Sequence, residues 1–215
     1  MIKFAIFDIG QVCYPYSLNP LNKFMQEEAK NSQKFIDNNG IKSFDYKPFM
    51  RGEINFMQFC KDLCNHCGVT YSPDINAKID KSMHKGVGDF FPETLQLMDN
   101  LRHKNITIGL LSNALPNLSD TAKNLTDKKN IFTSYELGLL KPDIKIFQVV
   151  LQKLNVKPQE VIFIDDKSAN VEAAKLIGIH GIVFERNTIA QKVEKVLKYN
   201  NINHWLSKND NLNKK

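Results

Sequence analysis

Residues 3–10, with the sequence KFAIFDIG, predict a central β-strand that ends in a carboxylate. The run from Lys3 to Phe7 is almost entirely apolar and shows no alternation of polar and apolar positions, as in a parallel strand buried on both faces. It stops at Asp8. Because ligands collect at the carboxyl ends of parallel strands, Asp8 is the first candidate functional residue.

Three further apolar runs follow, each after a segment with apolar residues at helical spacing, such as 92–103 or 143–154. The runs are ITIGLL at 106–111, VIFI at 161–164 and GIVF at 181–184. Strands that alternate with helices predict a parallel sheet with right-handed crossovers. We therefore expect the α/β fold class, with a Rossmann-like three-layer core.

The segment between residues 17 and 85 interrupts this alternation. Its apolar residues recur at helical spacing and no strand-like run appears. We expect an all-helical cap at 17–85, inserted after the first strand of a core made of 1–16 and 86–200. Residues 201–215 are rich in Asn and Lys and predict a polar tail that is loosely docked or disordered.

Polar residues end the predicted strands or open the helices beside them. In chain order they are Asp8, Ser112-Asn113, Lys141 and Asp165-Asp166. A carboxylate, a hydroxyl, an amide, a lysine and an acidic pair in one crevice suit a divalent metal and a phosphoryl group. The adjacent Asp165 and Asp166 also repel each other without a cation, which favours a metal site.

This set of groups resembles the four motifs of the haloacid dehalogenase superfamily. The matching segments are FDIGQV at 7–12, LLSNA at 110–114, GLLKPDIKIF at 138–147 and VIFIDDKSANVEAA at 161–174. The resemblance covers the whole core, and the helical insertion falls where the family commonly carries a cap. It implies an Mg²⁺-dependent phosphomonoester hydrolase that acts on a small phosphorylated metabolite, with a sugar phosphate favoured.

The resemblance implies that Asp8 is the nucleophile and forms an aspartyl phosphate, which divides one hard hydrolysis into two easier displacements. Mg²⁺ is expected to bind the Asp8 carboxylate, the Gly10 carbonyl, Asp166 and Asp165, because hard oxygen ligands suit this ion. Asn170 is expected to orient the acidic pair from the first turn of a helix.

Lys141 and Ser112 complete the expected catalytic set, since a positive charge and a hydroxyl can stabilise the transferring oxygens. Asn113, Gln11 and Arg51 are the expected substrate-binding residues. A helical cap over the strand ends would exclude water and favour small substrates. Further candidates for specificity are Tyr14, Tyr16 and Tyr46.

The sequence departs from the usual phosphatase pattern at Gly10. The commonest version of the family carries a second Asp there, which protonates the leaving group, and such a group contributes about 10² to 10⁴ in rate. A subset resembling bacterial sugar-1-phosphate phosphatases also carries Gly, usually followed by Asn where this chain has Gln11. The RGEI segment at 51–54 looks like that subset too. We expect esters of good leaving groups to be the better substrates.

Two alternatives stay open. In a 2-haloacid dehalogenase the same Asp displaces halide from carbon without metal, and that branch also lacks the second Asp. A weakly active or non-catalytic phosphate-ligand binder is the other, since a fold does not imply activity.

The cysteines at 60, 64 and 67 have the spacing of an iron–sulfur motif, but they fall on one apolar face of a helix with Phe59 and Leu63. Core packing is therefore the favoured interpretation, with a zinc site as the alternative.

Composition limits the remaining classes. The 215 residues are 42% hydrophobic and 24% charged with a net charge of +6, and the lysines form no basic stripe. We expect no nucleic acid and no membrane among the partners, a cytoplasmic location with reduced thiols, and a monomer or weak dimer.

Overall fold

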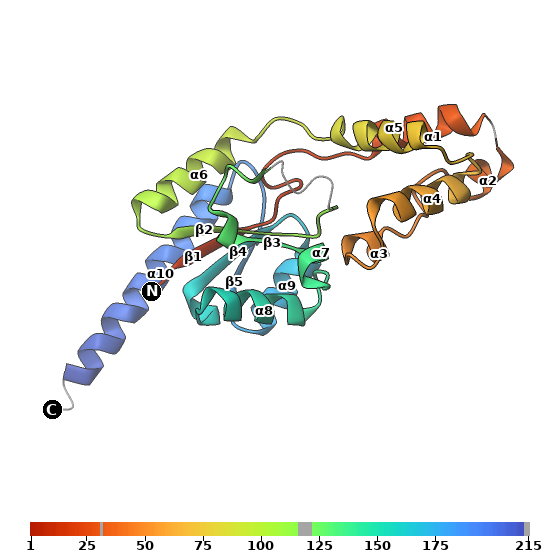
Figure 1. The fold of residues 1–215 in the computed structure, drawn as a ribbon. Coiled ribbons are helices and arrows are strands. Elements are labelled where there is room, and N and C mark those ends of the chain that lie inside the picture. The colour runs from red at the N-terminus through yellow and green to blue at the C-terminus, as the bar shows by residue number, and fades with distance from the viewer. Residues whose placement is uncertain (31, 116–121, 213–215) are drawn as a thin grey trace.

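The computed structural model describes residues 1–30, 32–115 and 122–212, with side chains described through residue 200. These residues contain a five-stranded parallel sheet of order β3-β2-β1-β4-β5 (Figure 1). The strands are β1 (Phe4–Phe7), β2 (Thr107–Ser112), β3 (Ile131–Thr133), β4 (Val161–Asp165) and β5 (His180–Val183). The α/β prediction is confirmed.

β1 lies at the centre of this sheet. Phe7 is in register with Leu110 of β2 and with Ile164 of β4, and the Asp8 amide donates to the Ile164 carbonyl at 2.8 Å. Because the three strands are parallel and in this register, the residues that follow them emerge at the same edge of the sheet.

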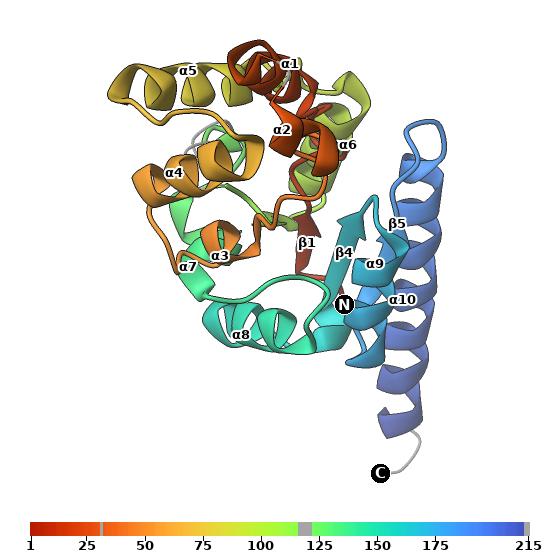
Figure 2. The same cartoon turned by 90° about the vertical axis from the view of Figure 1, so that its right-hand side faces the viewer.

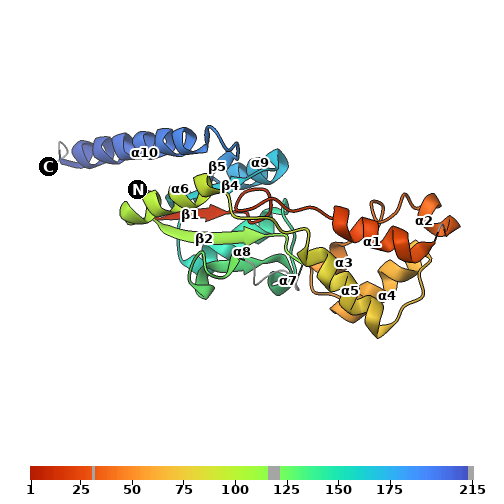
Figure 3. The same cartoon turned by 90° about the horizontal axis from the view of Figure 1, so that it is seen from above.

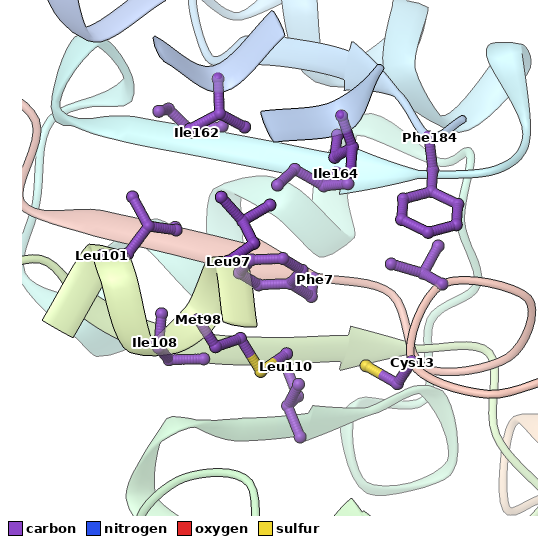
Figure 4. Packing of buried hydrophobic residues seen from close by; sticks show 14 of the residues in the cluster. Phe7, Cys13, Leu97, Met98, Leu101, Ile108, Leu110, Ile162, Ile164 and Phe184 are labelled. Carbon is purple, nitrogen blue, oxygen red and sulfur yellow. The ribbon is translucent and has the colours of Figure 1, made fainter. Parts of the chain in front are cut away.

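Helices cover both faces of the sheet and give three layers. On one face α6 (Pro92–His103) and α10 (Ile189–Leu212) share a buried cluster with Phe7. On the other face α8 (Ile144–Leu154) and α9 (Ser168–Leu176) pack against Phe163. Figure 4 shows how side chains of α6 surround Phe7 on the first face. Burying a Phe or Leu side chain stabilises the fold by about 1.5–3 kcal/mol.

The sequence misses β3. It is an edge strand of only three residues, preceded by the 3₁₀ turn Lys128–Asn130 and followed by the short helix α7 (Ser134–Leu137). Three residues are too few to show either an apolar run or an alternation. A further 3₁₀ turn, Pro158–Glu160, leads into β4.

The helices between residues 17 and 85, called the cap from here on, pack around a hydrophobic cluster that also includes Leu115 of the core. Figures 2 and 3 show the cap beyond the ends of the strands toward which the arrows of β1 and β2 point. Within the described residues its helices are α1 (Asn19–Ala29), α2 (Gln33–Asp37), α3 (Lys47–Met50), α4 (Phe56–Cys67) and α5 (Pro73–His84). Side-chain caps define the starts of α4 and α5, where Asn55 and Ser72 accept hydrogen bonds from backbone amides.

Cys60, Cys64 and Cys67 lie on α4 and are all buried in the cap core with free thiols. Their spacing follows the apolar face of the helix, so they pack as the periodicity predicts.

The cap and the core are in contact at the connecting segments and again at α7. The two connecting segments lie side by side, with Tyr16 bridged to Val87 and the Ser17 amide donating to the Gly86 carbonyl at 2.9 Å. At the start of α7, Ser134 Oγ donates a hydrogen bond of 2.7 Å to the Met50 carbonyl of α3. The cap is therefore attached at two separate places.

The structure differs from the sequence prediction at the C-terminal end. α10 continues to Leu212, so residues 201–212 of the predicted tail are helical, and 213–215 lie outside the described residues. The segment contains no Pro or Gly to end the helix. None of the helices among the described residues has the length and apolarity required to span a lipid bilayer.

Candidate active site

Three carboxylates meet at the edge of the sheet that faces the cap. Asp8 follows β1, Asp165 ends β4, and Asp166 comes next in the chain. One oxygen atom from each lies within 4.8 Å of the others. The parallel register of β1 and β4 accounts for this meeting, because it brings residues 157 positions apart in the chain, such as Asp8 and Asp165, to the same level.

Lys141 lies between two of these carboxylates. Its Nζ donates to Asp8 Oδ1 at 2.8 Å, to Asp165 Oδ2 at 2.6 Å and to the Leu111 carbonyl at 2.8 Å. Burial acts to lower the pKa of Lys141, but the Asp8 and Asp165 carboxylates outweigh it and hold that pKa above its usual value. The buried ammonium is therefore charged and all three of its protons have acceptors.

Asn113 holds the backbone of Lys141 in place. Its Nδ2 donates to the Lys141 carbonyl, and its Oδ1 accepts from the Lys141 amide, both at 2.9 Å. On the other side of Lys141, the Asp143 side chain caps α8 by accepting from the Lys145 amide. The amide of Asn113 thus fixes the lysine, although we expected it to bind substrate.

Asp165 already has partners for both oxygens. Asn170 Nδ2 on α9 donates to Oδ1 at 2.9 Å and to Oδ2 at 3.0 Å, and the Lys167 amide donates to Oδ1 at 2.9 Å. Together with Lys141, these donors surround a fully buried carboxylate. Asp165 is satisfied without any cation.

Asp166 is different. Its Oδ1 is buried and has no hydrogen-bond partner in the described part of the chain. Burial, and then the charges of Asp8 and Asp165, raise the pKa of Asp166 above its usual value. A buried acceptor beside two other carboxylates is the environment that a hard cation would stabilise.

The loop after β1 forms the floor of the site. Gln11 has a left-handed backbone with φ 64°, and its side-chain amide donates to the Tyr16 carbonyl at 2.7 Å. Gly10 has a φ outside the left-handed region, and the atom nearest to a Cβ built there is Tyr16 Cβ at 3.8 Å. Neither backbone conformation nor space therefore requires Gly at position 10.

A cavity of about 510 Å³ opens over these groups, between the strand ends and the cap. Its size falls in the range of small-molecule sites. The predicted residues that line it are Asp8, Gly10, Gln11, Tyr14, Tyr16, Tyr46, Ser112, Asn113, Lys141, Asp166 and Asn170. The sequence did not point to Leu18, Met50, Leu115 or Lys167, which line it as well.

The structure does not bring Arg51 to this cavity. Its side chain is 41% exposed and lies 3.6 Å from Glu53, whereas the preceding Met50 lines the cavity. Neighbouring residues at the end of a helix point about 100° apart, so a difference of one position decides which of them faces the site. The RGEI segment alone gave no signal for that direction.

Comparison with known proteins adds three kinds of finding. A protein-family model described as haloacid dehalogenase-like hydrolase matches residues 23–178, which include Ser112, Lys141 and the acidic pair but begin after Asp8. Mouse acyl-CoA dehydrogenase family member 10 is 30% identical over 87% of this chain, which spans only 18% of that protein.

Two relatives of similar length are named as phosphatases. D-ribitol-5-phosphate phosphatase of Bacteroides thetaiotaomicron is 25% identical over 83% of this chain and 89% of that protein. A sesquiterpene phosphatase of Aspergillus oryzae is 27% identical over 84% of this chain and 88% of that protein.

The fold also matches solved structures. A haloacid dehalogenase family enzyme from Bacteroides thetaiotaomicron, in complex with magnesium and inorganic phosphate, gives a TM-score of 0.69. It is 22% identical, with 86% of this chain and 96% of that chain covered.

Proposed function

The chain belongs to the haloacid dehalogenase-like hydrolases, and from this membership we propose that it hydrolyses a small phosphomonoester with Mg²⁺ through an aspartyl phosphate on Asp8. The whole activity of the longer relatives is not implied, because the chain spans 18% of one and 39% of another.

The observation that carries the proposal is the orphaned Asp166 Oδ1 beside Asp8. Lys141 compensates Asp8 and Asp165, so Asp166 is the carboxylate left over. A divalent cation would supply the missing charge and the missing partner. We propose that Asp8, Asp166 and the Gly10 carbonyl hold Mg²⁺, and that Asp165 positions Lys141 instead of binding the metal directly.

When bound, Mg²⁺ would offset the repulsion between a phosphate and the Asp8 carboxylate. The remaining work falls to residues of the chain. Lys141, hydrogen-bonded to Asp8 Oδ1, fixes the orientation of that carboxylate for attack on phosphorus. The Ser112 hydroxyl, at the end of β2 on the cavity wall, would bind a phosphate oxygen.

Gly10 leaves no carboxyl group at the position from which other members of the family protonate the leaving group. We infer that esters whose alcohol departs readily are hydrolysed faster than simple alkyl esters. The relatives act, by name, on a ribitol phosphate and on sesquiterpene phosphates, so they point to two different alcohols. The sugar phosphate favoured by the sequence stays a prediction for a substrate panel.

The dehalogenase alternative needs no metal, and the uncompensated Asp166 argues against it. A protein that binds a phosphate ligand without turnover would release no phosphate from any ester. Both are separated from our proposal by one assay.

That assay measures phosphate release from p-nitrophenyl phosphate with Mg²⁺ and with chelator, for the wild-type protein and for Asp8→Asn. We expect release that needs Mg²⁺ and that the substitution abolishes. Release that persists in chelator contradicts the metal role, and no release from any phosphate ester contradicts the enzyme. A matched variant outside the site, Asp89→Asn, should behave as wild type.

A further inference from the structure

The cavity has two chemically different halves. Toward the sheet, its charged lining residues are Asp8, Lys141, Asp166 and Lys167, all at the proposed phosphate and metal end. Toward the cap the lining changes to large apolar and aromatic side chains. These are Tyr16, Leu18, Tyr46, Met50 and Leu115, all of which belong to the hydrophobic cluster of the cap or pack against it.

The cap contributes no charged side chain to the described lining. Its lining residues are Ser17, Leu18, Tyr46 and Met50. Their polar atoms are also partly committed elsewhere, because Tyr46 Oη donates to the Ile41 carbonyl at 3.4 Å and Ser17 Oγ accepts from the Asn19 amide at 3.1 Å. This half of the cavity offers contact area and little hydrogen bonding.

Tyr16 is the exception, since its Oη is buried without a hydrogen-bond partner among the described residues. This single hydroxyl can donate one hydrogen bond and accept from a neighbouring ligand group. A sugar or polyol carries several hydroxyls, and each one buried without a partner weakens binding by roughly 5-fold to 100-fold. The cap half of the lining therefore disfavours a polyol, in contrast to the sugar phosphate that the sequence favours.

The apolar wall is held in a fixed position. Ser134 Oγ donates to the Met50 carbonyl at 2.7 Å, and a Cβ on Gly52 would lie 2.6 Å from the Tyr135 carbonyl, so the end of α3 packs directly on α7 of the core. Leu115 of the core belongs to the cap cluster as well. A ligand binds more tightly to an apolar surface that is already ordered, because less conformational entropy is lost on binding.

From this arrangement we propose that the alcohol part of the substrate is bulky and apolar and lies against Tyr46, Met50 and Leu18. The inference rests on the proposed function for the phosphate end. It assigns the class of ester, a phosphomonoester of a hydrocarbon alcohol, and it names Met50 as a residue that determines specificity.

The test uses straight-chain esters, because their leaving groups stay chemically alike while the apolar surface grows. We expect kcat/KM of n-alkyl phosphates, measured with Mg²⁺, to rise about twofold to fourfold per added methylene until the cavity is full. The Kd of the matching n-alkylphosphonates, which are not hydrolysed, should fall by the same factor.

Met50→Gln keeps the length of the side chain and adds an amide to the wall. It should reduce the gain per methylene in both series. Met57→Gln is the matched control, because Met57 lies on α4 of the same cap, is 48% exposed and does not line the cavity. Its gain per methylene should equal that of the wild-type protein.

The possible results test the apolar alcohol and the proposed phosphatase activity separately. A flat chain-length series, or a polyol phosphate that outperforms the alkyl ester of equal carbon number, overturns the apolar alcohol and leaves the phosphatase standing. Tight, chain-length-dependent binding of phosphonates without hydrolysis of any ester supports the apolar half and refutes the proposed catalysis. If Met50→Gln and Met57→Gln change the gain per methylene equally, Met50 does not determine specificity.

Discussion

Replacing Gly10 by Asp should add the proton donor that the site lacks. The structure tolerates the change, because the atom nearest to the new Cβ would be Tyr16 Cβ at 3.8 Å, an ordinary contact, and the backbone of residue 10 needs no left-handed φ. Residue 10 lines the cavity two positions after Asp8, and we expect a carboxyl group there to reach the leaving oxygen.

General acid catalysis contributes about 10² to 10⁴ in rate. The new carboxylate also adds a negative charge near Asp8 and Asp166, which works against phosphate binding. We therefore expect a gain near the lower end of that range, roughly 10²-fold in kcat for simple alkyl phosphates. For p-nitrophenyl phosphate, whose phenolate departs without a proton, we expect almost no gain.

The assay is kcat against the pKa of the leaving alcohol, measured with Mg²⁺. The wild-type slope should be steep and the Gly10→Asp slope shallow. Gly10→Asn is the matched control, since it has nearly the same shape and cannot deliver a proton. Equal rates for the Asp and Asn variants, or a gain of the same size for every leaving group, would refute the reasoning.

Three other outcomes follow from the burial and charge of the site. Lys141→Met leaves two buried carboxylates without their counterion. In chelator, it should lower the free energy of unfolding, measured with urea, by about 3–5 kcal/mol. A loss below about 1 kcal/mol would argue against a charged lysine. The folded-state pKa of Asp166 is raised, so the free energy of unfolding of the wild-type protein in chelator should fall as pH rises from about 4 through that raised pKa. Asp166→Asn should show a smaller fall. Equal pH profiles for the two proteins would assign the effect to other groups. Burial raises the pKa of Cys60 to about 12, so iodoacetamide at pH 8 should modify this cysteine only after unfolding, and rapid labelling of the native protein would contradict the packed cap core.

The central strands and the position of the site could be predicted because burial leaves a strong pattern. A parallel strand covered on both faces must be apolar throughout, so KFAIF and VIFI stand out, and the polar residue that ends each run marks the functional edge of the sheet. β3 left no such pattern, since three residues at an edge need little apolar surface.

The finer geometry depends on directions that a linear sequence does not carry. Ser112-Asn113 was visible as a polar pair, but only the fold turns the Asn113 amide toward the backbone of Lys141. Met50 and Arg51 are adjacent, and the end of a short helix decides which one faces the cavity. The apolar half of the cavity is built from residues of the cap and the core that no single segment brings together.

The covalent step gives the most direct measurement. Protein mixed with p-nitrophenyl phosphate and Mg²⁺ is quenched in acid during turnover, digested, and its peptides are weighed by mass spectrometry. Our account predicts a phosphoryl group on Asp8 in the peptide derived from the first strand, and no such group when chelator replaces Mg²⁺. Phosphate release at full rate with an unmodified Asp8, or with the label on another residue, would contradict it.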